Sequence, residues 1–287
     1  MQVIARPHEL RERVQQWRRQ GERIALVPTM GNLHAGHSSL IGHASAHADR
    51  VIASVFVNPL QFGPNEDYAA YPRTPAEDRK LLQSLHVDLL FVPEVEDIYP
   101  QGQTSTARVH VPQLEDILCG VFRPGHFMGV ATVVVKLLNL VQPDVAVFGE
   151  KDFQQLMIIR RAVTDLCMPI EIVGAPTTRE PDGLAMSSRN RYLTREQRRL
   201  APTIYTELTR ARAAIEAGSS DYAAIERTGF EALQQAGFRP DYFAVRDASD
   251  LSLPQAGATD LVVLTAARIG RARLIDNLRA RRPAPTG

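Results

Sequence analysis

Short apolar runs of strand length alternate with segments of helical pattern through the first part of the chain, and this alternation constrains the fold more than any other feature. The runs are rich in Val, Ile and Leu and each is too short for a helix. Strands that alternate with helices form βαβ units, in which the strands are parallel. We therefore predict an α/β fold with a doubly wound parallel sheet, whose ligands bind beyond the carboxyl ends of the strands. The predicted strands are residues 24–27, 51–57, 88–92, 145–148 and 170–173.

The pattern changes after about residue 176. Thr194 and Gln197 have the spacing of a capping box, which predicts one long helix from there to about residue 217. A second helix is predicted near residues 222–235, and three strand-like runs follow it. Helices followed by strands are typical of a small α+β domain. The sequence thus predicts a Rossmann-like domain over residues 1–176 and a smaller α+β domain over residues 177–287.

Two further helix starts are expected nearer the N-terminus. The first twenty residues contain Glu9 and Glu12 and lack the apolar core of a signal peptide, so they indicate an ordinary surface helix. Thr74 is expected to cap a helix that begins with Pro75, and Glu77 has the spacing that completes a capping box.

Charge and cysteine content limit the kinds of partner. The 33 Lys and Arg residues nearly balance the 32 Asp and Glu residues, so no net field attracts nucleic acid or a membrane surface. The two cysteines, Cys119 and Cys167, form no CxxC pair, which favours a reducing compartment, and no apolar run is long enough to span a bilayer. We expect a cytoplasmic protein whose partners are small molecules.

The segment PTMGNLHAGH, residues 28–37, lies between the first predicted strand and the next helix. His34 and His37 are three residues apart, so at a helix start they project from one face. A helix N-terminus carries partial positive charge and free N–H groups, which suit a phosphate, and two imidazoles can donate hydrogen bonds to phosphate oxygens. Gly31 and Gly36 allow close approach of the backbone to a nucleotide. We interpret the segment as a nucleotide-phosphate site.

Two alternatives to a phosphate site remain open. Histidines at this spacing can bind zinc, although the HExxH pattern is absent and no third ligand lies nearby in the sequence. They can also simply cap a helix. The sequence contains neither the G-x-x-x-x-G-K-[ST] nor the G-x-G-x-x-G motif, so any ATP is bound by other groups.

Lysine is rare in this chain, since only Lys80, Lys136 and Lys151 occur. Lys151 belongs to the segment GEKD, residues 149–152, directly after a predicted strand. An ammonium at the carboxyl edge of a sheet can neutralise charge on a transferring phosphoryl group. A surface turn is the alternative, and the rarity of lysine and the strand-end position favour a functional role.

Two weaker signals lie in loops. Ser187, Ser188 and Arg189 offer two hydroxyls and a guanidinium that can close over a triphosphate. Gln61 follows the second predicted strand, where its amide can bind both a hydroxyl and a carboxylate.

The chain resembles the pantoate–β-alanine ligase family in four long segments. These are PTMGNLHAGHSSL, FVNPLQFGPNEDYAAYPRT, RPGHFMGVATVVVKLLNLVQPDVAVFGEKDFQQLMIIRR and REPDGLAMSSRNRYL. The first and last also resemble the HIGH and KMSKS elements of the adenylyl-transfer superfamily, which includes class I aminoacyl-tRNA synthetases. The resemblance covers most of residues 24–193.

The resemblance implies a two-step reaction. Pantoate attacks the α-phosphorus of Mg-ATP to give pantoyl adenylate and pyrophosphate, and the amine of β-alanine then displaces AMP. His34, His37 and Lys151 would be catalytic, with His37 as the residue usually described as the proton donor. A carboxylate nucleophile needs no general base, so we expect both histidines to act first as electrostatic stabilisers.

The resemblance also assigns the remaining site residues. Gln61, Gln155 and Asn58 would bind pantoate or β-alanine. The ATP-binding residues would be Met30, Gly31, His34, Gly36, His37, Gly149, Glu150, Lys151, Asp152, Thr178, Met186, Ser187, Ser188 and Arg189. The Mg²⁺ ligands stay unassigned, because phosphate oxygens and water can hold that ion. The family resemblance further implies a homodimer.

Other functions remain possible at this point. An adenylyltransferase for a phosphorylated acceptor shares the HxGH element, but Gln61 and Gln155 suit a hydroxy acid better than a phosphate. A tRNA synthetase is disfavoured by the short chain and the lack of a basic face. A nucleotide-sensing domain on the same fold is a non-enzymatic alternative, against which His34, His37 and Lys151 argue.

Overall fold

The computed structural model describes residues 1–64, 66 and 68–283. The chain is divided into two compact units. The first contains Met1–Glu150 and Gln155–Pro176, and the second contains Lys151–Gln154 and the chain from Thr177 onwards. A helix long and apolar enough to cross a membrane is not found in the described part of the chain.

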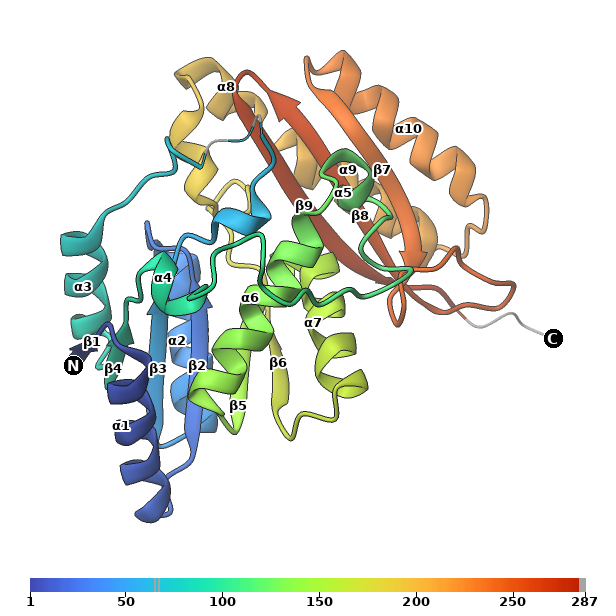
Figure 1. Ribbon diagram of the computed structural model, residues 1–287. Coiled ribbons are helices and arrows are strands. Elements are labelled where there is room, and N and C mark those ends of the chain that lie inside the picture. The colour runs from blue at the N-terminus through green and yellow to red at the C-terminus, as the bar shows by residue number, and fades with distance from the viewer. Residues whose placement is uncertain (65, 67, 284–287) are drawn as a thin grey trace. The chain divides into compact units, whose positions relative to one another are not determined.

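The first unit is built on a parallel sheet of six strands (Figure 1). In sheet order these are β1 (Gln2–Ile4), β4 (Leu89–Phe91), β3 (Arg50–Val55), β2 (Ile24–Thr29), β5 (Val145–Gly149) and β6 (Glu171–Ala175). From β2 the chain proceeds outward through β3 to β4, and it then returns to the other side of β2 for β5 and β6. The order therefore reverses between β2 and β5, where a doubly wound sheet binds its ligands. The predicted doubly wound α/β fold is confirmed.

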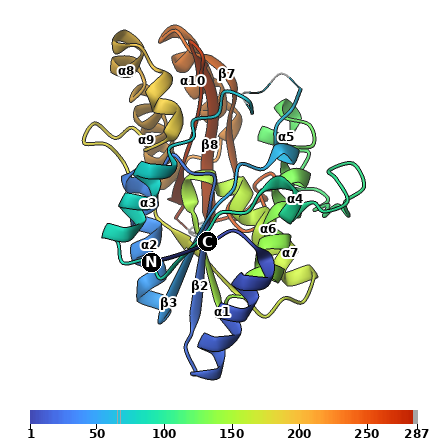
Figure 2. The ribbon, with the colours of Figure 1, turned by 60° about the vertical axis from the view of Figure 1, so that its left-hand side comes forward.

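Helices cover both faces of this sheet (Figure 2). One face packs against α1 (Pro7–Arg19), α6 (His126–Val141) and α7 (Phe153–Asp165). The opposite face packs against α2 (Ala35–His47) and α3 (Pro75–Ser84). Shorter helical pieces in the connections are η1 (Pro59–Gln61), α4 (Val95–Ile98), α5 (Cys119–Phe122) and η2 (Glu150–Asp152).

The residue pattern of the central strand explains the two cores. In β2, Ile24 and Leu26 face the core of α1 and α6, whereas Ala25 and Val27 face the core of α2. All four side chains are fully buried, because successive residues of a strand point to opposite faces and both faces are covered here. The continuous apolar runs of the sequence are thus the strands of a doubly covered sheet.

The second unit is a small α+β domain, as predicted. Its antiparallel sheet has the order β7 (Arg239–Asp247), β8 (Asp260–Ile269) and β9 (Ala272–Arg281). Two helices, α9 (Thr203–Glu216) and α10 (Tyr222–Gln235), pack against this sheet and against each other. The short elements η3 (Ser188–Tyr192) and α8 (Arg195–Leu200) precede them.

Two predicted elements are wrong in extent. The single long helix expected from Thr194 to about residue 217 is divided into α8 and α9, although the Thr194–Gln197 capping box is present. The division falls at Pro202, which has no N–H to continue the helical hydrogen bonds. The N-terminal segment predicted as helix also contains β1, which pairs with β4 at the edge of the sheet.

The first strand runs two residues further than predicted and includes Pro28. Pro28 pairs in register with Ser54 of β3, whereas β5 pairs with β2 only at Ala25 and Leu26. The pairing with β5 has therefore ended before Pro28. Because proline has no N–H, this residue could not donate a hydrogen bond to β5, and none is needed there.

Candidate active site

The predicted site segments follow the ends of three adjacent strands. Residues 30–37 follow β2, residues 58–61 lie just after β3, and residues 149–152 begin at the end of β5. Because the three strands are parallel neighbours, their carboxyl ends share one edge of the sheet. This edge includes the β2–β5 position where the strand order reverses.

His34 and His37 cap the helix that follows β2. His34 is the N-cap residue of α2, and its Nδ1 accepts a hydrogen bond from Gly36 N at 3.1 Å. His37 Nδ1 accepts a hydrogen bond from His34 N at 3.2 Å, and the centroids of the two rings are 4.2 Å apart. The two side chains thus form a capping box built from imidazoles, so the helix-capping alternative is correct for their Nδ1 atoms.

The capping box determines which ring nitrogen can donate. In a neutral imidazole one nitrogen carries the proton and the other accepts. Because both Nδ1 atoms accept from the backbone, the neutral rings of His34 and His37 carry their protons on Nε2. The N–H groups of Gly36 and His34, which were expected to be free for a phosphate, are occupied by these rings. Any phosphate contact from the pair therefore comes from Nε2–H.

The loop before the helix is held by a carboxylate from α3. Gly31 and Asn32 both have left-handed backbone conformations, with φ of 78° and 51°. Asp78 Oδ2 accepts a hydrogen bond from Asn32 N at 2.9 Å, and its Oδ1 accepts one from Leu33 N at 2.8 Å. A Cβ on Gly31 would lie 3.0 Å from Asp78 Oδ2, so the glycine is required by space as well as by conformation.

Asp78 also accounts for a wrong capping prediction. The Thr74 side chain makes no capping hydrogen bond to the helix backbone. Its hydroxyl donates instead to Asp78 Oδ1 at 3.0 Å. Thr74 is still the N-cap residue and Pro75 still begins α3, as expected, but Glu77 completes no capping box.

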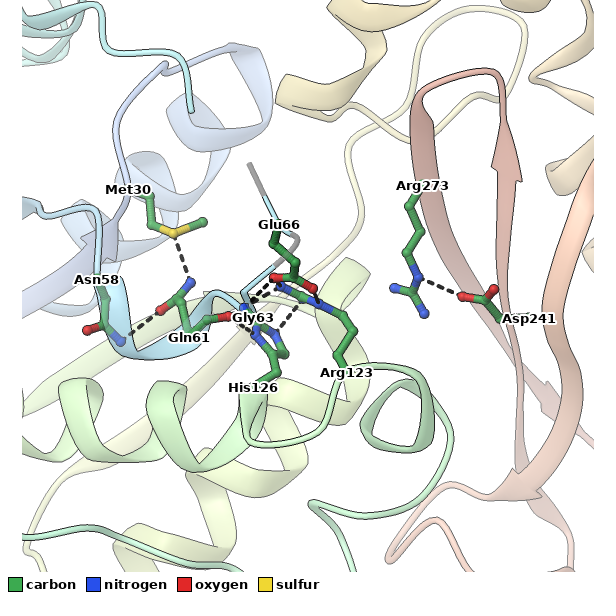
Figure 3. A network of polar contacts seen from close by, with 9 residues as sticks. All are labelled: Met30, Asn58, Gln61, Gly63, Glu66, Arg123, His126, Asp241 and Arg273. Carbon is green, nitrogen blue, oxygen red and sulfur yellow. Dashed lines mark hydrogen bonds and ion pairs between the residues drawn. The ribbon is translucent and has the colours of Figure 1, made fainter. Parts of the chain in front are cut away.

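The Gln61 amide lies beside Met30 (Figure 3). Gln61 is 7% exposed, and its Nε2 lies 2.8 Å from Met30 Sδ, while its Oε1 accepts from Asn58 Nδ2 at 3.2 Å. A thioether is a weak acceptor. The amide of Gln61 can therefore exchange Met30 for a substrate oxygen without losing a strong hydrogen bond.

Asn58 is held by protein groups on all sides. Its Nδ2 donates to Gln61 Oε1 and to Gly129 O, at 3.2 and 3.1 Å. Its Oδ1 accepts from the Tyr99 hydroxyl at 2.7 Å and from Leu60 N at 3.3 Å. Both amide protons and two acceptor positions are thus in use, so Asn58 is placed to orient Gln61. Burial raises the pKa of the Tyr99 hydroxyl, which stays a donor.

Gly129 allows this close arrangement. A Cβ at this position would lie 2.3 Å from the main-chain oxygen of Leu60. The first turn of α6 can therefore approach η1 only if residue 129 has no side chain.

Arg123 and His126 hold the main chain of Gln61 (Figure 3). The carbonyl oxygen of Gln61 lies 2.8 Å from His126 Nδ1 and 3.4 Å from Arg123 Nη2. His126 Nε2 lies 2.8 Å from Arg123 Nη1, which can only donate. With Nε2 accepting from Arg123, His126 can donate from Nδ1 to the carbonyl of Gln61.

Glu66 completes this network from the loop after η1. Its two carboxylate oxygens accept from Arg123 Nε and Nη2, both at 2.6 Å. Burial alone would raise the pKa of Glu66, but the hydrogen bonds and charge of Arg123 outweigh it and hold the pKa below its usual value. The pair fastens this loop to the N-terminal end of α6.

Lys151 lies in η2, directly after β5, and its segment groups with the second unit. Its side chain is 17% exposed, and its Nζ is 3.9 Å from Asp152 Oδ2. The main-chain oxygen of Lys151 accepts a hydrogen bond from Asn277 Nδ2 of β9 at 3.0 Å. The backbone at the lysine is thus held by the C-terminal sheet.

Arg179 lies in the segment after β6 and binds the same part of β9. Its Nη1 and Nη2 lie 2.6 and 2.9 Å from the two carboxylate oxygens of Asp276. Its guanidinium carbon lies 4.3 Å from the centroid of the Tyr205 ring. Burial raises the pKa of the Asp276 carboxyl, against the opposing effect of Arg179.

The loop predicted to close over a triphosphate is an ordered turn. Met186 N donates to Thr178 O at 3.0 Å, so these two predicted ATP-binding residues are neighbours. Ser187 Oγ accepts from Arg189 N at 3.3 Å and caps η3, which contains Ser188 and Arg189.

The structure thus gathers the predicted residues in two groups. In the first unit Gly149 is the last residue of β5, and Gln155 lies partly exposed in the first turn of α7. The other predicted residues of this unit follow the strand ends; these are Met30, Gly31, His34, Gly36, His37, Asn58, Gln61 and Glu150. In the second unit Lys151, Asp152, Thr178, Met186, Ser187, Ser188 and Arg189 are partly exposed. Sequence reasoning missed the positioning groups Asp78, Tyr99, Arg123, His126 and Asn277. Arg123 and His126 had a signal, since they lie in the RPGHF segment.

Side chains that could bind a metal ion form no suitable cluster in the described part of the chain. Within residues 1–64, 66 and 68–283, no three His, Cys, Asp or Glu side chains cluster in a way that could hold a metal ion. The zinc alternative for His34 and His37 has no third ligand there.

Comparisons with known proteins agree over nearly the whole chain. The family model described as pantoate-beta-alanine ligase matches residues 2–279. A pantothenate synthetase from Alkalilimnicola ehrlichii is 54% identical over 278 residues, which is 97% of each chain. One from Azotobacter vinelandii is 56% identical over 270 residues, covering 94% of this chain and 95% of that one.

Solved structures give the same result. The crystal structure of pantothenate synthetase from Thermus thermophilus has a TM-score of 0.90 at 48% identity, covering 97% of this chain and 99% of that one. Pantoate-beta-alanine ligase from Francisella tularensis, complexed with beta-gamma ATP and beta-alanine, has a TM-score of 0.80 at 36% identity over 97% of both chains. From the full-length match of sequence and fold, this chain belongs to the pantoate–β-alanine ligase family.

Proposed function

We propose that this chain condenses (R)-pantoate with β-alanine to form pantothenate, using ATP and releasing AMP and pyrophosphate through a pantoyl adenylate. The observation that carries the proposal is the imidazole capping box of His34 and His37. It presents two Nε2–H donors at the strand end where a doubly wound sheet binds its ligand, in a chain of this family.

In the first step a carboxylate oxygen of pantoate attacks the α-phosphorus of ATP, and the bond from that phosphorus to the bridging oxygen of pyrophosphate breaks. Negative charge grows on the leaving pyrophosphate. His34 and His37 donate their Nε2–H groups to phosphate oxygens, and Lys151 supplies a compact positive charge. No proton is taken from the carboxylate, so the histidines act as electrostatic stabilisers.

Gln61 and Gln155 are proposed to orient pantoate. Gln61 donates from Nε2 to a pantoate oxygen in place of Met30, and Gln155 provides a second amide. Asn58 contributes indirectly, by fixing the Gln61 side chain through its Oε1. In the second step the neutral amine of β-alanine attacks the acyl carbon, AMP leaves with the electron pair of the mixed-anhydride bond, and the new amide nitrogen loses a proton to solvent.

Further residues are assigned to ATP in this proposal. They are Met30, Gly31, Gly36, Gly149, Glu150, Lys151, Asp152, Thr178, Met186, Ser187, Ser188 and Arg189. In this proposal residues 1–176 form the ATP- and pantoate-binding domain and residues 177–287 form a lid that excludes water from the adenylate.

Magnesium enters as part of the substrate, bound to phosphate oxygens and water. We further propose a homodimer in the cytoplasm. Cys119 and Cys167 form no disulfide among the described residues, which fits a reducing compartment. Sedimentation velocity measures the oligomeric state.

The proposal is tested by following pantothenate and AMP with ATP and Mg²⁺ in four mixtures: pantoate and β-alanine together, each alone, and neither. We expect pantothenate and AMP in equal amounts only when both substrates are present. Turnover of a phosphorylated acceptor without pantoate would instead assign the chain to the adenylyltransferases. Tight ATP binding with no turnover of any acid would favour a nucleotide-sensing domain.

A further inference from the structure

Asp78 is a buried carboxylate that has no part in the reaction described above. It lies in the first turn of α3, the helix that precedes β4, and is 3% exposed. Three donors converge on its two oxygens: Asn32 N at 2.9 Å, Leu33 N at 2.8 Å and the Thr74 hydroxyl at 3.0 Å. A buried charge is retained only when it is compensated in this way.

The two main-chain donors belong to an unusual piece of backbone. Gly31 and Asn32 are successive residues in the left-handed region, and this conformation turns the N–H groups of Asn32 and Leu33 toward one side. Such a concave run of N–H groups is a site for an anion, and here the anion is the carboxylate of the protein itself. Left-handed Asn32 is strained relative to an extended residue, so the conformation depends on surrounding groups to hold it.

This loop determines where α2 begins. The strand β2 ends at Thr29, and α2 begins at Ala35 directly after its N-cap residue His34. Only four residues connect the strand end to His34, and Asp78 holds two of them. A change in this short connection would therefore move His34 and His37 relative to the sheet edge.

We propose that Asp78 is a positioning residue that sets the direction of the His34 and His37 imidazoles by fixing the backbone of residues 31–33. The proposal rests on the proposed function, in which these imidazoles bind the phosphates of ATP. The alternative role for a carboxylate near a nucleotide is that of a Mg²⁺ ligand. The geometry favours positioning, because both oxygens of Asp78 already accept from protein donors.

Glu77 provides a matched control. It directly precedes Asp78 in the same turn of α3 and is exposed. Its carboxylate can be changed to an amide, as can that of Asp78. Asp78→Asn replaces one carboxylate oxygen with an NH₂ group, so one of the two main-chain N–H groups then faces a donor instead of an acceptor. Glu77→Gln removes a charge at nearly the same place and leaves the loop bonds intact.

The experiment measures pantoate-dependent exchange of pyrophosphate into ATP for the wild type and both variants, at a series of Mg²⁺ concentrations. We expect Asp78→Asn to lower the maximal exchange rate roughly 10- to 100-fold, since small misplacements of catalytic groups have effects of this size. The Mg²⁺ concentration for half-maximal rate and the KM for pantoate should stay within about twofold of wild type. Glu77→Gln should match the wild type.

Two results would overturn the proposal. One is an Asp78→Asn rate equal to that of Glu77→Gln, and the other is an Asp78→Asn rate restored by high Mg²⁺, which is the behaviour of a lost metal ligand. If wild type and Glu77→Gln both lack exchange, the proposed function fails independently of Asp78.

A second measurement begins with the unaltered protein. Amide hydrogen exchange of the unaltered protein should show strong protection at Asn32 and Leu33, although both lie in a connection outside the helices and strands. Thr74→Val should reduce this protection by removing one donor to the same carboxylate. Exchange at Asn32 and Leu33 as fast as in a solvent-exposed loop would contradict the role of Asp78 whatever the activity of the variants.

Discussion

The side-chain amide of Asn277 donates a hydrogen bond to the main-chain oxygen of Lys151 at 3.0 Å, across 126 positions of sequence. The backbone that carries the proposed catalytic lysine is therefore held by β9 of the C-terminal sheet. The same stretch of β9 carries Asp276, which binds Arg179 through two hydrogen bonds. The C-terminal sheet thus holds the backbone of a residue for which we propose a catalytic role.

Asn277→Ala should lower the rate of adenylate formation about 10- to 100-fold with little change in the KM for pantoate, because Lys151 keeps its charge but loses its fixed position. Lys151→Ala, which removes the ammonium itself, should lower it further. Rapid-quench measurement of the first step gives both values. Asn139→Ala is the control, since it removes a similar amide-to-carbonyl bond, to Val135 O at 2.9 Å in α6. Equal rates for Asn277→Ala and the control would remove Asn277 from the account.

The two nitrogens of His37 can be tested separately. Asn offers an oxygen near the position of Nδ1, so His37→Asn should keep the hydrogen bond from His34 N and lose only the Nε2–H donor. We expect a nearly unchanged melting temperature and a loss of roughly 10²–10³ in the rate of the first step. His37→Ala loses both functions and should also lower the free energy of unfolding by about 0.5–2 kcal/mol. An active His37→Asn variant would show that Nε2 carries no phosphate contact.

Tyr99→Phe removes the donor that fixes Asn58. The Tyr99 hydroxyl is buried and bonds to Asn58 Oδ1 at 2.7 Å, and Asn58 in turn holds Gln61. We expect a loss of about 0.5–1.5 kcal/mol in the free energy of unfolding, the usual net value of such a bond. The KM for pantoate should rise several-fold while the KM for ATP stays constant, as steady-state kinetics will show. Tyr205→Phe, which alters a tyrosine of the second unit, should leave both KM values unchanged.

Glu66→Gln tests the ion pair with Arg123 through its pH dependence. The folded-state pKa of Glu66 lies below its usual value, so the pair contributes stability above the unfolded pKa of about 4.3 and loses it as the pH falls through the folded value. Near pH 7 the variant should be less stable than the wild type by about 1–3 kcal/mol.

This difference in unfolding free energy should shrink as the pH is lowered below about 4.3. Denaturant titrations at several pH values measure it. Glu12→Gln, at an exposed position of α1, should show no such pH-dependent difference. A difference for Glu66→Gln that stays constant down to pH 3 would contradict the ion-pair account.

The parts of the fold and site that depend on local sequence could be predicted. The strand, turn and helix around residues 24–48 are determined by adjacent residues: an apolar run, a left-handed Gly31 and a capping residue at the helix start. The pairing of His34 with His37 follows from their spacing alone. The family membership was likewise evident from continuous segments, and the comparisons confirm it.

The supporting contacts could not be predicted because their partners are far apart in the sequence. Asp78 is 46 positions from Asn32, and Tyr99 is 41 positions from Asn58. No local pattern indicates which distant carboxylate or hydroxyl meets a given backbone group. The strand β1 was missed because three residues at a sheet edge have almost no periodic pattern. The break at Pro202 was predictable from the proline itself, whose effect on a helix is local.

In the proposed reaction this chain activates pantoate as an adenylate before β-alanine takes part. The most direct measurement is exchange of labelled pyrophosphate into ATP by the wild-type protein with Mg²⁺, with pantoate and β-alanine each present or absent. We expect exchange that requires pantoate and proceeds without β-alanine. Exchange that requires β-alanine, or pantothenate formation without any pantoate-dependent exchange, would contradict it.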